Sequence, residues 1–141
     1  MYSIVCPVLF GAFLPRTEKG GHLRAECIYA AISLVASQFG PNCEVVVHDL
    51  ATNDPERSIV AIENGHVTGR KVGDGPSHVV LEALRGNPEQ LHDHLSYLTR
   101  TKDGKILKST TIYIRDDNGV PLGIFGINYD ITLMLAMENA I

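Results

Sequence analysis

The segment Lys105–Thr132 constrains the fold more than any other part of the chain. It reads KILKSTTIYIRDDNGVPLGIFGINYDIT, with two runs rich in β-branched residues on either side of a turn sequence. Asn118-Gly119 supplies the positive φ angles that a tight hairpin requires, and β-branched residues favour strands. The second run leaves through Asp130-Ile131-Thr132, where Asp130 and Thr132 can position a following helix. The segment therefore predicts a long β-hairpin that ends in a helix.

The register of this hairpin decides which side chains share a face of the sheet. A two-residue loop places Ile112 opposite Phe125. The same loop places Thr110 opposite Ile127, whereas a three-residue loop moves Ile112 opposite Ile124. A change of one residue in the loop exchanges the two faces, and the sequence leaves both registers open.

Helical and extended segments alternate through the rest of the chain. Apolar residues at spacings of three, four or one predict a helix over Leu23–Phe39, which Gly40-Pro41 ends. Asn64-Gly65 is either a hairpin turn or the start of an irregular stretch, and the glycines that follow favour the irregular stretch. The other predicted elements are strands over Cys43–Leu50, Ser58–Glu63 and Leu95–Thr101, and a helix over Ser77–Arg85 capped by Ser77.

These elements predict an α+β fold. We expect a five-stranded antiparallel sheet with helices on one face, together with N-terminal and C-terminal helices. A length of 141 residues suits one compact domain. We divide the chain into an N-terminal arm and linker over residues 1–22, a sheet domain over 23–132, and the start of a C-terminal helix over 133–141.

Composition and charge exclude several classes of protein. The formal net charge of −4 argues against a nucleic-acid surface spread over the chain. Three scattered cysteines, Cys6, Cys27 and Cys43, are too few for a disulfide framework and fit a reducing cytoplasm. Met1–Leu14 is apolar, but it lacks the charged start of a signal peptide and is too short to cross a bilayer. We expect a cytoplasmic protein without a membrane segment.

Three stretches of the chain carry a family resemblance: FGPNCEVVVHDL (Phe39–Leu50), SIVAIENGHVTGRKVGD (Ser58–Asp74) and LKSTTIYIRDDNGVPLGIFGINYD (Leu107–Asp130). The Asp-Ile-Thr step that follows the last stretch is typical of the end of many PAS sensors. Over about residues 24–132 the chain resembles the YheO-like PAS domain of bacterial helix-turn-helix transcription regulators.

The resemblance implies a PAS-like sheet with a ligand pocket between its concave face and the helices of the middle segment. It also implies that the Asp-Ile-Thr step starts a helix that passes signals onward. In that family a helix-turn-helix DNA-binding domain follows the PAS domain. Because the chain ends at Ile141 without one, we expect DNA contact only through such a domain on a longer polypeptide.

The candidate ligand-binding residues lie on the strands and in the glycine-rich stretch. Arg70, with Lys71 beside it, lies among backbone N–H groups that can hold a carboxylate or a phosphate. His48 can bond a ligand from the sheet or be a structural histidine. Gly123 and Gly126 either open space over the sheet or relieve a bend. The full set of candidates is Arg70, His48, Thr110, Asn128 and Thr68.

Enzyme chemistry finds little support in the sequence. Cys43 and His48 would lie about 16 Å apart along one strand, far beyond hydrogen-bond reach. His92 and His94 share a face if their stretch is extended, but no motif supplies a third metal ligand. We therefore expect no catalytic residues, no metal and no cofactor.

A sensor is the function that fits these observations best. It would bind an unknown small metabolite, or a partner domain, and pass a conformational bias through its C-terminal helix. The apolar stripe of that helix predicts a homodimer, and its members are Leu133, Met134, Ala136 and Met137. Two alternatives stay open: a ligand-free dimerisation module and a small-molecule enzyme on an α+β scaffold. An internal cavity would favour the sensor over the module.

Overall fold

The computed structural model describes residues 21–51, 54–87 and 91–140. The predicted arm over residues 1–22 lies outside these residues except for its last two positions. In chain order the elements are α2 (Gly21–Phe39), β1 (Cys43–Asp49), η1 (Pro55–Arg57), β2 (Ile59–Glu63), η2 (Gly65–Val67), α3 (His78–Arg85), β3 (His94–Arg100), β4 (Ile106–Arg115), β5 (Pro121–Asp130) and α4 (Thr132–Glu138).

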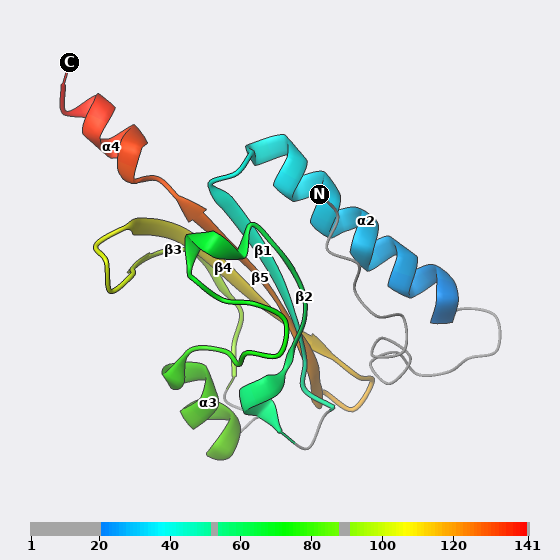
Figure 1. The fold of residues 1–141 in the computed structure, drawn as a ribbon. Coiled ribbons are helices and arrows are strands. Elements are labelled where there is room, and N and C mark those ends of the chain that lie inside the picture. The colour runs from blue at the N-terminus through cyan, green and yellow to red at the C-terminus, as the bar shows by residue number, and fades with distance from the viewer. Residues whose placement is uncertain (1–20, 52–53, 88–90, 141) are drawn as a thin grey trace.

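The strands form a five-stranded sheet in the order β2-β1-β5-β4-β3, and every neighbouring pair is antiparallel (Figure 1). The meander β3-β4-β5 follows β1 and β2, and its last strand returns to lie beside β1. The predicted five-stranded antiparallel sheet is therefore confirmed. At the end of β5 the chain enters α4, which projects away from the sheet, whereas α3 lies near the opposite ends of the strands.

The β4-β5 hairpin combines features of both predicted registers. Asp116 and Val120 close a three-residue loop through a bond from Asp116 N to Val120 O at 3.0 Å, and Gly119 has a φ of +80°. A bulge next to Arg115 then shifts the pairing by one residue. Ile112 consequently lies opposite Phe125, which is the register expected of a two-residue loop.

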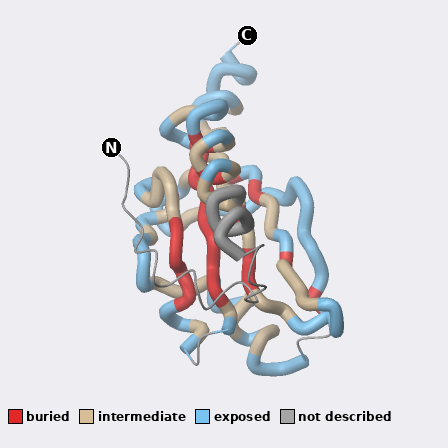
Figure 2. The backbone as a smooth tube through the Cα atoms, turned by 90° about the vertical axis from the view of Figure 1, so that its right-hand side faces the viewer, coloured by how far each residue is buried: buried red, intermediate tan, exposed pale blue. Residues whose placement is uncertain are grey.

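The two faces of the sheet pack against different helices. On one face α2 packs on β1 and β2, and the three elements share an apolar cluster whose buried members are Ile32, Ala36, Cys43, Val45, Val47, Val60 and Ala61. On the other face α3 packs near Leu91, Tyr113 and Ile124. Figure 2 shows the buried stretches running along the central strands. The face under α3 is the one on which a groove remains.

The structure tests two predicted local signals, the turn at Asn64 and the helix cap at Ser77. Asn64 has a left-handed φ of 55° and leads into η2, so the irregular alternative is confirmed and the hairpin turn is wrong. Its side-chain Nδ2 donates to Gly40 O at 3.1 Å and to Cys43 O at 2.8 Å. Ser77 is the N-cap residue of α3, as predicted, although its side chain makes no capping bond.

Strand β3 is the exposed edge of the sheet, and each of its residues is exposed. Its pairing with β4 is irregular between His94 and Tyr97. Within that stretch Ser96 takes a left-handed φ of 51°, and its N–H donates to Thr110 Oγ1 at 3.1 Å. Regular pairing resumes over Tyr97–Arg100.

No helix in the described part of the chain is long and apolar enough to cross a membrane.

Candidate ligand-binding groove

A groove of about 910 Å³ lies between the sheet and the segment that runs from η2 through α3. Volumes of this order are typical of small-molecule sites. The floor comes from the sheet and includes Val46, His48, Ile124, Gly126 and Asn128. The facing wall includes Val67, Thr68, Arg70, Val80 and Ala83.

Gly126 keeps the floor of the groove open. A Cβ atom at this position would come within 3.1 Å of Val46 Cγ1, closer than most real contacts. Gly123 does not line the groove, because it pairs with Asp49 and Ile114 on the opposite face. The sequence allowed two roles for both glycines, to open space over the sheet or to relieve a bend. Of the two, only Gly126 borders the groove.

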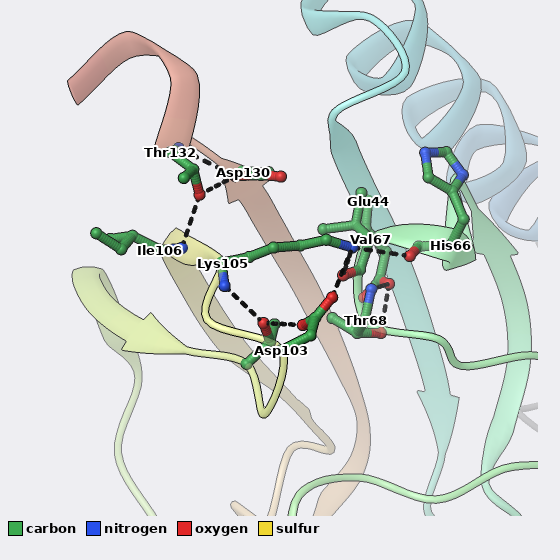
Figure 3. Close-up of polar contacts among 10 residues, drawn as sticks. Glu44, His66, Val67, Thr68, Asp103, Lys105, Ile106, Asp130 and Thr132 are labelled. Carbon is green, nitrogen blue, oxygen red and sulfur yellow. Dashed lines mark hydrogen bonds and ion pairs between the residues drawn. The ribbon is translucent and has the colours of Figure 1, made fainter. Parts of the chain in front are cut away.

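A buried carboxylate, that of Glu44, anchors the groove wall to the sheet. Glu44 has no exposed surface. Its Oε2 accepts bonds from Thr68 N at 3.2 Å and from Thr68 Oγ1 at 2.6 Å (Figure 3). Its Oε1 accepts a bond from Asn128 Nδ2 at 2.8 Å. Asn128 Oδ1 in turn accepts from Ser109 Oγ at 2.8 Å. These bonds form a polar row across β1, β5 and β4.

This row changes the interpretation of two predicted site residues. Thr68 and Asn128 both line the groove, but the hydroxyl of Thr68 and the amide of Asn128 bond to protein groups. Their first role is to satisfy the buried charge of Glu44, since a buried charge without bonded partners is strongly unfavourable. Glu44 was not among the predicted site residues, although it stands out as a lone carboxylate in the apolar run CEVVV.

His48 lies on the floor and is 2% exposed. Its Nδ1 lies 2.9 Å from Ser58 Oγ. Burial lowers the pKa of His48 from 6.5 to about 3, and the positive charge of Arg70 contributes to the same shift. His48 is therefore neutral at physiological pH, and its bond to Ser58 supports the structural alternative without removing it from the groove.

Arg70 lies on the wall of the groove and is half-buried. The loop that carries it folds tightly over Gly65, whose carbonyl accepts bonds from Gly69 N at 2.8 Å and from Arg70 N at 3.1 Å. A Cβ atom at Gly65 would come within 2.3 Å of Arg70 O. Only glycine fits there, so the sequence fixes the path of the backbone beneath Arg70.

Thr110 does not line the groove, unlike its neighbour Thr111. The hairpin register pairs Thr110 with Ile127, and Ile127 packs against the cluster under α2 on the opposite face. The predicted place of Thr110 at the ligand site is therefore corrected. Its hydroxyl oxygen instead accepts the bond from Ser96 N in the bulge of β3.

His92 and His94 both line the groove near its open edge. Within residues 21–51, 54–87 and 91–140, no group of three or more His, Cys, Asp and Glu side chains is placed to hold a metal ion.

Lys105 connects the groove wall to β4. Its Nζ donates to the carbonyl oxygens of Val67 at 3.2 Å and of His66 at 3.4 Å (Figure 3). The same ammonium lies 3.7 Å from Asp103 Oδ2. Lys105, the residue immediately before β4, thus connects η2 to that strand.

The next residue along the chain, Ile106, is tied to the start of α4. Ile106 N donates to Thr132 Oγ1 at 2.8 Å, and Ile131 N donates to Ile106 O at 3.0 Å. Asp130 Oδ1 accepts bonds from Thr132 Oγ1 at 2.6 Å and from Thr132 N at 3.0 Å (Figure 3). Asp130 and Thr132 therefore position the exiting helix, as the sequence predicted.

Comparison with known families agrees with this architecture. The YheO-like PAS domain family matches residues 24–141. The chain belongs to that family. The match covers most of the chain and includes the sheet, the groove and α4.

Curated relatives include two bacterial proteins. YheO of Escherichia coli K12 is 36% identical over 110 residues, which cover 72% of this chain and 42% of YheO. The transcriptional regulator DauR of Pseudomonas aeruginosa is 29% identical over 107 residues, which cover 76% of this chain and 47% of DauR. The chain thus spans less than half the length of these relatives.

Among solved structures, an RNA-binding light-oxygen-voltage receptor is similar with a TM-score of 0.49 and 13% identity. The alignment covers 89% of this chain and 38% of the receptor. A likeness at this level says nothing about ligand or activity.

Proposed function

We propose that this chain is the sensory domain of a bacterial transcription regulator, that it binds a small metabolite in the groove, and that it is not an enzyme. The observation that carries the proposal is the groove of about 910 Å³, which combines an apolar floor with a half-buried arginine. Membership of the YheO-like PAS family and the similarity to the regulator DauR support the regulatory role. The sensor comprises residues 23–132, and the output helix begins at its end.

The bonds of Lys105 and Thr132 suggest how occupancy of the groove reaches that helix. Lys105 holds the groove wall, and the adjacent Ile106 holds Thr132 at the start of α4. A ligand that moves the wall by a small amount would pull on β4 at the residue next to α4. Such a displacement biases the orientation of α4, which is the differential response that signalling requires.

Charge indicates that DNA contact belongs to another part of a longer polypeptide. Helices α2 and α3 each contain one arginine, and α4 contains no Lys or Arg. With a net charge of −4 the chain has no general attraction for phosphates. The scattered cysteines support a cytoplasmic location.

A second candidate function is dimerisation without a ligand. Leu133, Met134 and Met137 of α4 are exposed at 67%, 48% and 61%, and a short helix with an uncovered apolar side is stabilised by packing on a partner. Dimerisation and sensing are compatible, since a dimer gives the output helix a partner to move against.

Native mass spectrometry of freshly purified protein tests the sensor proposal. We expect a co-purified small molecule, or a compound from a metabolite library that raises the melting temperature and slows hydrogen exchange around residues 65–70. The variant Gly126→Leu places a side chain over the floor of the groove. It should abolish ligand co-purification and stabilisation by library compounds while retaining the spectrum of a folded protein. A folded protein that no library compound stabilises would leave dimerisation as the function.

A further inference from the structure

The groove carries a charge opposite to that of the chain. Among the described residues that line it, Arg70, Arg100, Lys102 and Lys105 are cationic and Asp103 is the acidic one. Arg100 lies on the exposed edge strand β3. The lining is therefore positive in a chain whose net charge is −4.

The cations of the lining are not equivalent. Lys105 is already held by two carbonyl oxygens and lies 3.7 Å from Asp103. Lys102 is exposed in the turn between β3 and β4. For the guanidinium of Arg70 the described residues provide no hydrogen bond and no carboxylate within 4 Å. Arg70 is thus a half-buried cation of the groove whose side chain makes no hydrogen bond or ion pair with another described residue.

The surroundings of Arg70 hold it ready for a ligand. The backbone is fixed by the two bonds to Gly65 O, and Thr68 is fixed by its two bonds to the buried Glu44. Both oxygens of Glu44 are occupied by Thr68 and Asn128, and Glu44 does not line the groove. A guanidinium on a fixed loop loses little freedom when it binds an acceptor.

The floor next to Arg70 is uncharged. His48 is neutral and bonded to Ser58, and Val46, Ile124 and Gly126 add apolar surface. An ammonium group at this place would meet the uncompensated charge of Arg70. A carboxylate or a phosphate would instead accept a two-pronged bond from the guanidinium in a poorly hydrated setting, where such bonds are strong.

We propose, on the basis of the sensing role proposed above, that the ligand is a small organic anion whose carboxylate or phosphate group binds Arg70. Its body lies over the apolar floor at Gly126 and Ile124. A groove of about 910 Å³ is far larger than an inorganic ion needs, so an organic body is part of the ligand. Lys71, the exposed neighbour of Arg70, has no part in this site and does not line the groove.

Three probes that share one ring test the proposal: benzoate, phenyl phosphate and the neutral benzamide. Each is titrated into ¹⁵N-labelled protein at constant ionic strength, and the amide signals of residues 68–71 and 126 are followed. We expect saturable shifts with at least one anion and binding of benzamide weaker by about tenfold or more, a difference of about 1.4 kcal/mol. The tighter anion identifies the oxyanion that the site prefers.

Two matched variants locate the effect. Arg70→Gln should lose the anion-dependent shifts, whereas Lys71→Gln removes an equal charge one residue away and should bind as the parent protein does. The spectrum of each variant without a probe reports whether it is folded. Equal affinity for benzamide and benzoate, undiminished binding by Arg70→Gln, or the absence of saturable shifts with all three probes would overturn the proposal.

These outcomes are separable from those of the sensor proposal. A neutral metabolite that co-purifies in the groove would refute the anion while leaving the sensor intact. Anion binding that depends on Arg70 but leaves hydrogen exchange in α4 unchanged would retain the site and refute its signalling role.

Discussion

At the scale of single residues, Glu44 places a carboxylate where no surface is exposed to solvent. Its carboxylate lies fully buried in β1 and accepts three bonds, two from Thr68 and one from Asn128. Glu44→Ala leaves those donors without an acceptor, and we expect a loss of about 2–4 kcal/mol in the free energy of unfolding, since each unsatisfied buried donor is unfavourable by roughly 1–3 kcal/mol. Urea denaturation measures this loss.

Glu63→Ala on β2 is the matched control for this experiment. Glu63 is half-buried, and its side chain makes no hydrogen bond or ion pair with another described residue. Its replacement should change the free energy of unfolding by less than about 1 kcal/mol. Equal losses in the two variants would show that Glu44 does not hold the groove wall.

His48 makes stability depend on pH. Its pKa falls from 6.5 to about 3 on folding, through burial first and Arg70 second. Below pH 6.5 His48 is protonated in the unfolded chain but stays neutral in the folded chain. The contribution of neutral His48 to stability is therefore complete above pH 6.5 and is lost as the pH falls toward 3. We expect the free energy of unfolding to drop by about 1.4 kcal/mol per pH unit from this residue.

Comparison of the parent protein with His48→Asn isolates the contribution of His48 to the pH dependence of stability, because other groups titrate equally in both proteins. Below pH 6.5 the slope of the variant should become smaller than that of the parent protein, by a difference that approaches about 1.4 kcal/mol per pH unit near pH 5. Imidazole signals in the parent protein give a second measurement that does not depend on the variant. A His48 ring that titrates near pH 6.5 would contradict the prediction.

Residues of the site differ in how far the sequence predicts them. The place of Arg70 and Thr68 in a tight loop was predictable, because the glycines around them mark a loop that approaches other backbone closely, as Gly65 does. Thr110 was not, because a bulge beyond the loop decides its face. Glu44 was not, because a charge in an apolar strand is interpretable only when its partners on β5 and in the loop are known.

At the scale of elements, the junction between β5 and α4 depends on one hydroxyl. Thr132 Oγ1 accepts from Ile106 N and donates to Asp130. Thr132→Val removes both bonds and leaves Ile106 N unpaired, so we expect a loss of about 1–2 kcal/mol in the free energy of unfolding and faster hydrogen exchange in α4. Thr132→Ser keeps the hydroxyl and should retain slow exchange. Unchanged exchange in the valine variant would refute the proposed connection to α4.

The elements themselves were largely predictable, because strands β1, β2 and β4 are dense in β-branched residues and α2 ends at Gly40-Pro41. The predicted bounds of α3 differ from the observed ones by one residue. The register of the hairpin was not predicted, because the two runs fit either loop length and the bulge beside Arg115 decides between them. The turn residues favour the observed loop, and packing of Ile127 and Phe125 under α2 favours the observed pairing of β4 with β5.

At the scale of the whole molecule, the exposed side of α4 predicts a homodimer. Met137→Glu together with Leu133→Glu places charge on the exposed apolar stripe, and sedimentation velocity at micromolar concentration should then show a monomer where the parent protein is a dimer. Asn139→Glu adds a charge at an exposed polar position and should remain dimeric. A parent protein that sediments as a monomer would refute this assembly.

The irregular edge strand β3 has a consequence for how these molecules meet in a crowded cell. An exposed edge is a template on which another chain can extend the sheet without limit. In β3 the left-handed Ser96 breaks the row of outward backbone groups and leaves a regular stretch of only Tyr97–Arg100, which ends in a charged side chain. A foreign strand can therefore pair over a few residues at most, and the open edge is protected against growth into aggregates while the groove behind it stays accessible.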